Sequence, residues 1–212
     1  MRIGIVGVGP VGQTLGTAWA RSGHEVAFGS RDPARAAAAV ADLDGAHAMT
    51  QEEAAAFGET VLWTPRGVMP ADPDMLAGKI VLDPNNREPE PGRDYATPRP
   101  EGPSYAERLQ AAAPQARVVK AFNTIVMRVL RETPVWLAAS GAQVLLASDD
   151  TEAKAVVAAL AADIGLGTVD FGGLDASWLV EAMADGFRQG MRTSPAEWRQ
   201  ALVFADLRDG AN

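Results

Sequence analysis

Three glycines near the start of the chain have the spacing of a phosphate-binding turn. Gly7, Gly9 and Gly12 follow an apolar run and precede a stretch of helical periodicity, with Pro10 and Val11 between them. In such a turn the first glycine permits a tight bend, the second lets the backbone approach a pyrophosphate, and the third lets helix and strand pack closely. The free N–H groups and the dipole at the helix N-terminus then favour a phosphate. The spacing therefore predicts a dinucleotide site.

The end of the next apolar run predicts which dinucleotide is bound. An NAD enzyme usually places Asp or Glu there to bind the ribose 2′-hydroxyl, whereas this run ends in Ser30 and Arg31. A hydroxyl and a guanidinium suit a 2′-phosphate, which indicates NADP. Asp32 followed by Pro33 is typical of an N-cap and first helical position. Arg35, one turn further on, is either a second cation for the phosphate or a solvated charge.

Alternating strand and helix patterns must position these residues. We expect strands at 2–6, 24–28, 61–65, 79–83, 117–123, 143–147 and 168–171, and helices at 10–21, 33–41, 50–57, 104–113, 150–164, 175–189 and 194–208. This order predicts an α/β fold, a Rossmann doubly wound and mostly parallel sheet with a small C-terminal α/β appendage. We place an NADP-binding domain at 1–140 and the appendage, helical at its end, at 141–212. Ligands of such sheets lie beyond the carboxyl ends of the strands.

Composition narrows the class of partners. The 212 residues carry a formal net charge of −8 and no cysteine. The charge argues against nucleic acid or an anionic membrane as a partner, and no apolar stretch is long enough to span a bilayer. Without cysteine there are no thiolate ligands, and no histidine and carboxylate cluster has metal-ligand spacing. We expect a cytoplasmic protein without a metal site.

Candidates for general acid or base catalysis are few. The only histidines, His24 and His47, fall at the amino ends of expected strands, away from the ligand edge. The remaining candidates are Lys120, Asp83, Tyr95, Tyr105 and Glu181. Lys120 is the best of them because its strand ends at the site, although a lysine in a strand can equally pair with a carboxylate. A dinucleotide site without a clear proton donor suits hydride transfer to a flavin-like acceptor, where the cofactors carry the chemistry.

Several stretches support this interpretation. The segments 2–12, 29–31, 118–125, 145–150 and 172–176 resemble the family of NADP oxidoreductases dependent on coenzyme F420, a 5-deazaflavin. The resemblance implies a Rossmann core, a small C-terminal α/β part and NADP bound with its nicotinamide against the deazaflavin. It also implies that no dedicated acid or base is needed.

The resemblance assigns roles to residues by motif. The glycine loop would hold the pyrophosphate, and Ser30 with Arg31 the 2′-phosphate. The ribose and nicotinamide would be flanked by Thr64, Pro65, Arg66 and Asn85. The face on which the second ring stacks would be lined by Phe122, Asn123 and Thr124. The better-known deazaflavin enzymes have His-Thr-Ile where this chain has Asn123-Thr124-Ile125.

Three functions stay open at this point. The first is hydride exchange between NADP and a deazaflavin, and the second is NADPH-dependent reduction of a small C=O or C=N compound. The third is a non-catalytic NADP-binding redox sensor. Six prolines in the segment 84–103 indicate a lid beside the nicotinamide or an inert excursion. The apolar C-terminal helices suggest a homodimer.

Overall fold

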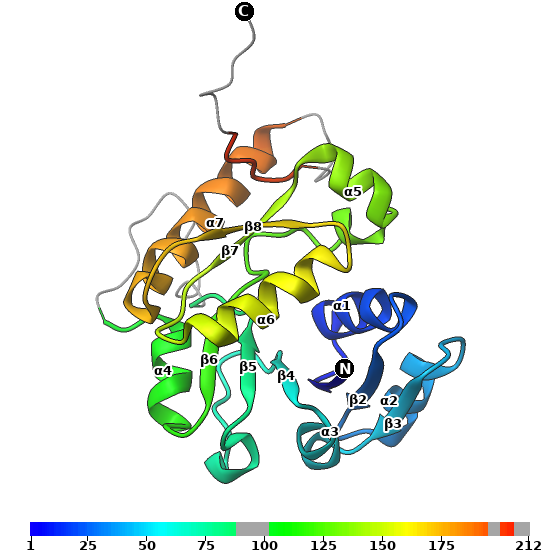
Figure 1. Ribbon diagram of the computed structural model, residues 1–212. Helices are drawn as coiled ribbons and strands as arrows, with labels where there is room; N and C mark the ends of the chain where they lie inside the picture. The colour runs from blue at the N-terminus through cyan, green and yellow to red at the C-terminus, as the bar shows by residue number, and fades with distance from the viewer. Residues whose placement is uncertain (88–101, 195–199, 206–212) are drawn as a thin grey trace, which may run out of the picture.

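The core of the protein is a six-stranded parallel sheet. The computed structural model describes residues 1–87, 102–194 and 200–205 (Figure 1). The strands are β1 (Arg2–Val6), β2 (Glu25–Gly29), β3 (Ala46–Met49), β4 (Thr60–Trp63), β5 (Ile80–Asp83) and β6 (Arg117–Lys120). Their order is β3-β2-β1-β4-β5-β6, so the winding reverses between β1 and β4. This is the Rossmann order, and the predicted fold class is confirmed.

Helices cover both faces of this sheet. They are α1 (Pro10–Arg21), α2 (Pro33–Val40), α3 (Gln51–Phe57) and α4 (Tyr105–Ala112). Leu15 and Trp19 of α1 pack into one apolar cluster with Ile5, whereas α3 and α4 pack into a second cluster on the other face. Because the two clusters contain alternate strand residues, the strands are buried on both sides, as parallel strands are.

Helices α2, α3 and α4 begin at the positions that their capping residues predict. Asp32 accepts a hydrogen bond from the N–H of Ala34 at the start of α2. Thr50 and Ser104 each open a helix with a complete capping box, in which the side chains of Glu53 and Glu107 return to the cap N–H. The order of elements thus follows from local sequence signals at these positions.

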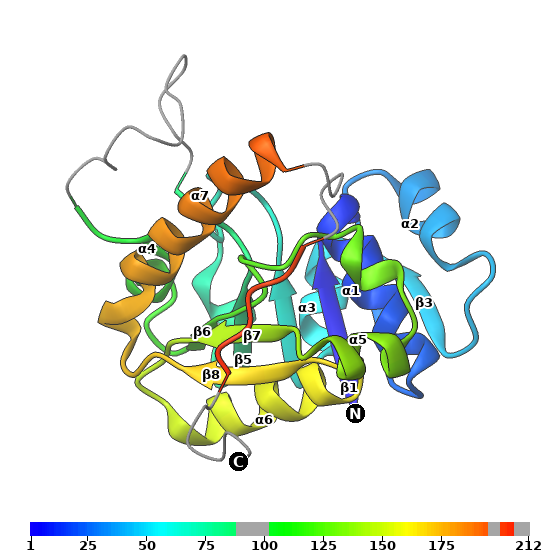
Figure 2. The same cartoon turned by 90° about the horizontal axis from the view of Figure 1, so that it is seen from above.

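The C-terminal part adds a second, two-stranded parallel sheet. It contains α5 (Pro134–Ser140), β7 (Gln143–Leu146), α6 (Thr151–Ala162), β8 (Gly167–Asp170) and α7 (Ser177–Thr193). Helices α6 and α7 lie on opposite sides of β7 and β8, as both views show (Figures 1 and 2). An antiparallel bridge between Lys120 and Ala147 connects this sheet to β6. The Trp19 indole N–H also donates to the Leu160 carbonyl at 2.9 Å, which ties α6 to α1.

Short 3-10 turns complete the chain. These are η1 (Pro73–Leu76), η2 (Val129–Arg131) and η3 (Leu174–Ala176). Within the described ranges, no helix has the length and apolar character needed to cross a membrane. A division of the chain at residue 140 stays a prediction.

Two elements differ from expectation. The helix predicted at 194–208 is wrong over 200–205, which form no helix, and its remaining residues beyond Ser194 lie outside the described ranges. There the backbone of Phe204 instead donates to the Gln143 side chain at the edge of β7. Strand β3 and helix α5 were not predicted, since β3 is a partly exposed edge strand without a clear apolar pattern. Most of the predicted lid, residues 88–101, lies outside the described residues.

Candidate active site

The glycine turn between β1 and α1 has the steric features that its sequence predicts. Gly7 has φ +99°, and its N–H donates to the Gly29 carbonyl at 2.9 Å. A Cβ at Gly12 would overlap with the Gly7 carbonyl, whereas a Cβ at Gly9 would meet nothing within 4 Å. The backbone at Gly9 is therefore open to a ligand. Helix α1 starts at Pro10 without a side-chain cap, so the first N–H groups of the helix are left for that ligand.

Thr64 holds this turn in place. Its hydroxyl lies 2.8 Å from the Val6 carbonyl and 3.0 Å from the Gly7 carbonyl. The end of β4 thereby fixes the turn that follows β1. The carbonyl of the next residue, Pro65, accepts a hydrogen bond from the Tyr105 hydroxyl at 2.7 Å. Thr64 thus supports the turn, and Pro65 links the end of β4 to α4, through contacts that the motif alone did not indicate.

The end of β2 presents a hydroxyl and two cations. Ser30 is buried, and its Oγ accepts a hydrogen bond from the Asp32 N–H at 3.1 Å, which leaves its hydroxyl hydrogen available. Arg31 and Arg35 are exposed, and within the described part of the chain Arg31 makes no hydrogen bond or ion pair. The Asp32 carboxylate is engaged as the cap of α2. This arrangement suits a phosphate better than a ribose hydroxyl.

A cavity of about 260 Å³ lies where the strands end. It brings together six of the residues predicted for the site, namely Val11, Thr64, Arg66, Asn85, Phe122 and Asn123. It also contains residues to which the sequence assigned no role in binding NADP, namely Pro84, Asn86, Arg87, Ile125, Met127 and Arg188; of these, Met127 and Arg188 were missed altogether. Of these, Arg188 comes from α7, so the C-terminal part contributes to the cavity.

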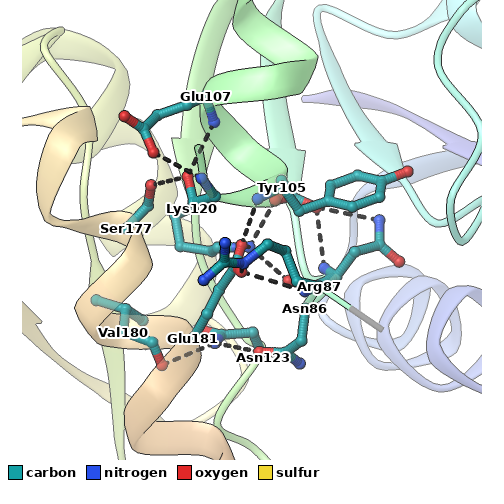
Figure 3. A network of polar contacts seen from close by, with 12 residues as sticks. Asn86, Arg87, Tyr105, Glu107, Lys120, Asn123, Ser177, Val180 and Glu181 are labelled. Atoms are coloured by element: carbon teal, nitrogen blue, oxygen red, sulfur yellow. Dashed lines mark hydrogen bonds and ion pairs between the residues drawn. The ribbon is translucent and has the colours of Figure 1, made fainter. Parts of the chain in front are cut away.

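A network of buried charges lies at the carboxyl ends of β5 and β6 and reaches α7 (Figure 3). Asp83 at the end of β5, Lys120 at the end of β6 and Glu181 in α7 are all fully buried. The Lys120 ammonium lies 2.6 Å from Asp83 Oδ2 and 2.9 Å from Glu181 Oε1, and it also donates to the Asn85 carbonyl. Its three donors are thereby satisfied. Lys120 was the predicted catalytic candidate, and here it joins two strands and a helix.

The carboxylates of the network hold further parts of the site. Glu181 accepts hydrogen bonds from the backbone N–H groups of Tyr105 at 2.8 Å and Arg87 at 3.1 Å. Asp83 Oδ1 accepts from the backbone and side-chain N–H groups of Asn85 at 2.9 and 3.0 Å. The Asn85 amide also donates to the Trp63 carbonyl at 2.9 Å. Asn85 is therefore fixed between the ends of β4 and β5.

Burial raises the pKa of two groups near the site. Desolvation raises the pKa of the Asp83 carboxyl above its usual range, although the Lys120 ammonium opposes the shift. Desolvation also raises the pKa of the Tyr105 phenol to about 12, with the Asp83 charge adding to the shift. A phenol with this pKa, donating to carbonyl oxygens, is a poor proton donor at neutral pH.

The end of β6 turns sharply toward α7. Phe122 has φ +62°, a left-handed conformation that is unusual for a side chain of this size. Its ring is buried edge-on against Trp19, with 5.6 Å between ring centroids. After this turn, Asn123 donates from Nδ2 to the Val180 carbonyl at 3.1 Å and to Asn86 Oδ1 at 2.9 Å. Thr124 follows, almost fully buried.

Other residues that could do chemistry lie away from this edge. His24, just before β2, contacts Asp163 Oδ2 at 3.0 Å, and His47 in β3 packs its ring against Phe57. A larger cavity of about 510 Å³ is lined by α1 and the segment 130–137 and includes none of the predicted site residues. In the described part of the chain, no group of three His, Cys, Asp or Glu side chains could hold a metal ion.

The N-terminal part of the chain is similar to a known protein family. Residues 2–87 match the family described as NADP oxidoreductase, coenzyme F420-dependent, so the resemblance inferred from the sequence is confirmed. A chain from Arthrobacter sp. FB24, described as a candidate F420-dependent NADP reductase, is 26% identical with a TM-score of 0.73. That match covers 91% of this chain and 94% of the other.

Two further proteins are similar to this chain. Metalloreductase STEAP3 of Rattus norvegicus is 32% identical over 186 residues, which are 86% of this chain. The chain spans only 36% of the length of that protein. A reductive aminase from Aspergillus terreus, in complex with NADPH and ethyl levulinate, is 20% identical with a TM-score of 0.63. The match covers 90% of this chain and 62% of the aminase, and it shows a shared fold.

Proposed function

We propose that the chain is an NADP-dependent oxidoreductase and that it transfers a hydride between NADP(H) and a deazaflavin of the coenzyme F420 type. The observation that supports this proposal is the lining of the 260 Å³ cavity. Among the described residues that line it, the ionisable ones are Arg66, Arg87 and Arg188. An arginine stays protonated in proteins and does not serve as a general acid or base at neutral pH. Transfer from ring to ring needs neither.

The chain's own residues would bind and orient NADPH. The N–H groups after Gly9 would hold the pyrophosphate, and Ser30 with Arg31 the 2′-phosphate, with Arg35 as a second cation. Thr64, Pro65, Arg66 and Asn85 would flank the ribose and nicotinamide. Bound NADPH supplies a hydride, which carries two electrons to the acceptor. The positive field of the three arginines favours the negative charge that the acceptor gains.

Lys120 is a positioning residue in this proposal. Its side chain is fully buried and its ammonium is held by Asp83, Glu181 and the Asn85 carbonyl, so it does not face a substrate. The alternative function, reduction of a small C=O or C=N compound, requires a proton donor at the cavity. The described lining offers none, which favours the deazaflavin. The non-catalytic redox sensor would show NADPH binding without oxidation by any acceptor.

The Arg31→Ala variant tests whether Arg31 binds the 2′-phosphate of NADPH. A charge-assisted hydrogen bond contributes about 1.5–3 kcal/mol, and about 1.4 kcal/mol is tenfold in affinity. We expect NADPH to bind about 10- to 100-fold more weakly and NADH to be nearly unaffected, as measured by fluorescence titration. Arg21→Ala, an exposed arginine at the far end of α1, is the matched control. Equal losses for both nucleotides would contradict the role of Arg31.

The identity of the hydride acceptor is tested by measuring the rate at which the protein reduces coenzyme F420, with NADPH and with NADH as the hydride donor. Fast and NADPH-selective reduction would support both parts of the proposal. Tight NADPH binding with no reduction of coenzyme F420 would retain the nucleotide and eliminate the acceptor. A homodimer and a cytoplasmic location stay predictions.

A further inference from the structure

The loop that follows β4 brings Arg66 to the cavity at the strand ends. Arg66 and Gly67 form a turn, in which Gly67 has φ +66°, a left-handed conformation that favours glycine. Both residues are exposed, so burial of their own side chains does not fix the turn. The position of Arg66 therefore depends on what holds the backbone on either side of it.

The two carbonyls that flank this turn are bound by one tyrosine hydroxyl. The hydroxyl of Tyr105 lies 2.7 Å from the Pro65 carbonyl oxygen and 3.0 Å from that of Val68. The indole N–H of Trp63 also donates to the Val68 carbonyl, at 3.1 Å. Tyr105 is 1% exposed and Trp63 4% exposed, and both belong to the same apolar cluster. The turn is thus attached to the core both before and after Arg66.

The other end of Tyr105 is fixed by the buried charges. Its backbone N–H donates to Glu181 at 2.8 Å, and α4 starts at this residue. The ring points away from the network of charges (Figure 3). Desolvation raises the pKa of the Tyr105 phenol to about 12, so the hydroxyl keeps its proton at neutral pH and remains a donor to the two carbonyls. Tyr105 therefore forms a rigid connection between the buried charges and the turn.

We propose that Tyr105 is a positioning residue for the nucleotide, and that its hydroxyl holds the turn so that Arg66 reaches the part shared by NADPH and NADH. This inference rests on the proposed function, in which Arg66 flanks the ribose and nicotinamide. Tyr105 is not among the described residues that line the cavity, so it acts through Arg66 and not by contact with the ligand. Its effect should be the same for both nucleotides, unlike that of Arg31.

The Tyr105→Phe variant removes the hydroxyl and keeps the buried ring. We expect NADPH and NADH both to bind about 5-fold more weakly in fluorescence titrations, the effect of about one net hydrogen bond. The Trp63 indole would still hold the Val68 carbonyl, so the variant should fold, with a thermal midpoint about 2–4 °C lower. Unchanged affinities would overturn the inference, and so would a loss confined to NADPH.

The matched control is a variant of similar stability loss far from the turn. Asp150 pairs with Arg117, and neither residue lines the cavity. Asp150→Asn should lower the thermal midpoint by a similar amount and leave both affinities unchanged. Equal losses of affinity in Asp150→Asn and Tyr105→Phe would show that reduced stability, and not the turn, weakens binding.

A double-mutant cycle tests whether Tyr105 acts through Arg66. Arg66→Ala alone should weaken both nucleotides about 10-fold, the effect of one charge-assisted hydrogen bond. In that background Tyr105→Phe should lower the thermal midpoint but cause no further loss of affinity, because the two changes share one interaction. A further 5-fold loss, or an unchanged affinity in Arg66→Ala alone, would contradict the inference. Failure of the proposed function would instead appear in the unmodified protein, as no NADPH binding or no reduction of coenzyme F420, so the two failures are distinguishable.

Discussion

The Lys120→Met variant tests whether this lysine organises the site or takes part in the chemistry. Methionine has a similar length and no charge, so the variant would leave the carboxylates of Asp83 and Glu181 buried without their cation. Both are fully buried, and each lies within 3 Å of the ammonium in the native protein. The Asn85 carbonyl would also lose its donor.

The size of the effect follows from this burial. Breaking a buried ion pair by removing one partner costs about 3–5 kcal/mol. For a chain of this length, about 1 kcal/mol corresponds to about 2–4 °C in the thermal midpoint, so the loss should be about 6–20 °C. Without the lysine, desolvation of the Asp83 carboxyl is no longer opposed by the ammonium, so the pKa of Asp83 should rise further in the folded state. Stability contributed by a raised pKa is present at low pH and lost as pH increases, so the variant should be less impaired at pH 5 than at pH 8.

The assay combines thermal unfolding at both pH values with steady-state kinetics. A second substitution, Glu181→Gln, removes one of the unpaired charges, and the double variant should recover part of the lost stability. A positioning role predicts a raised KM for the second substrate, with kcat largely recovered when the double variant is folded. A native thermal midpoint together with an abolished kcat would refute this reasoning and identify Lys120 as the proton donor of a reductase.

Three further perturbations have expected outcomes. Asp150→Asn should lower stability by about 1 kcal/mol at pH 7 after allowance for solvent screening, because the Arg117 guanidinium holds the pKa of Asp150 at about 2. This stability is present above pH 4 and lost as pH falls toward 2, so the difference between variant and native unfolding curves should vanish there. Gly12→Ala should weaken NADPH binding at least tenfold in a fluorescence titration, because the Cβ would overlap with the Gly7 carbonyl; unchanged affinity would show that α1 can shift without loss. Thr50→Ala should lower the free energy of unfolding in urea by about 1 kcal/mol, because it removes the capping box of α3. A smaller loss than that of the control variant Gln51→Ala would contradict a stabilising role of the capping box.

The features that sequence could predict are local. The glycine turn, the Asp32 cap and the capping boxes at Thr50 and Ser104 each depend on residues within a few positions of one another. Local signals of this kind were enough to predict the Rossmann class of the fold. The same kind of signal misled at Ser194, where Ser-Pro-Ala-Glu is typical of a helix start. Residues 200–205 run beside β7 instead, a long-range pairing that outweighs local preference.

The features that sequence could not predict at the site are long-range. Lys120 and Asp83 are separated by 37 positions, and Asn123 and the Val180 carbonyl by 57. The sequence does not show which carboxylates pair with Lys120, or that Phe122 adopts a left-handed conformation after β6. The lining residue Arg188 was missed for the same reason, since α7 reaches the strand ends only through tertiary packing.

The charge balance of the buried network explains why α7 is part of the site. Lys120 and the nearby Arg87 carry two positive charges, and Asp83 and Glu181 carry two negative charges. Without Glu181, the positive charges would exceed the negative ones in a region of low dielectric, which is unfavourable. Helix α7 supplies the missing charge, and the same helix brings Arg188 to the cavity at the strand ends. The ion pair between Lys120 and Glu181 thus also holds α7 against the strand ends, so a site without an acid or base can still depend strongly on buried charge.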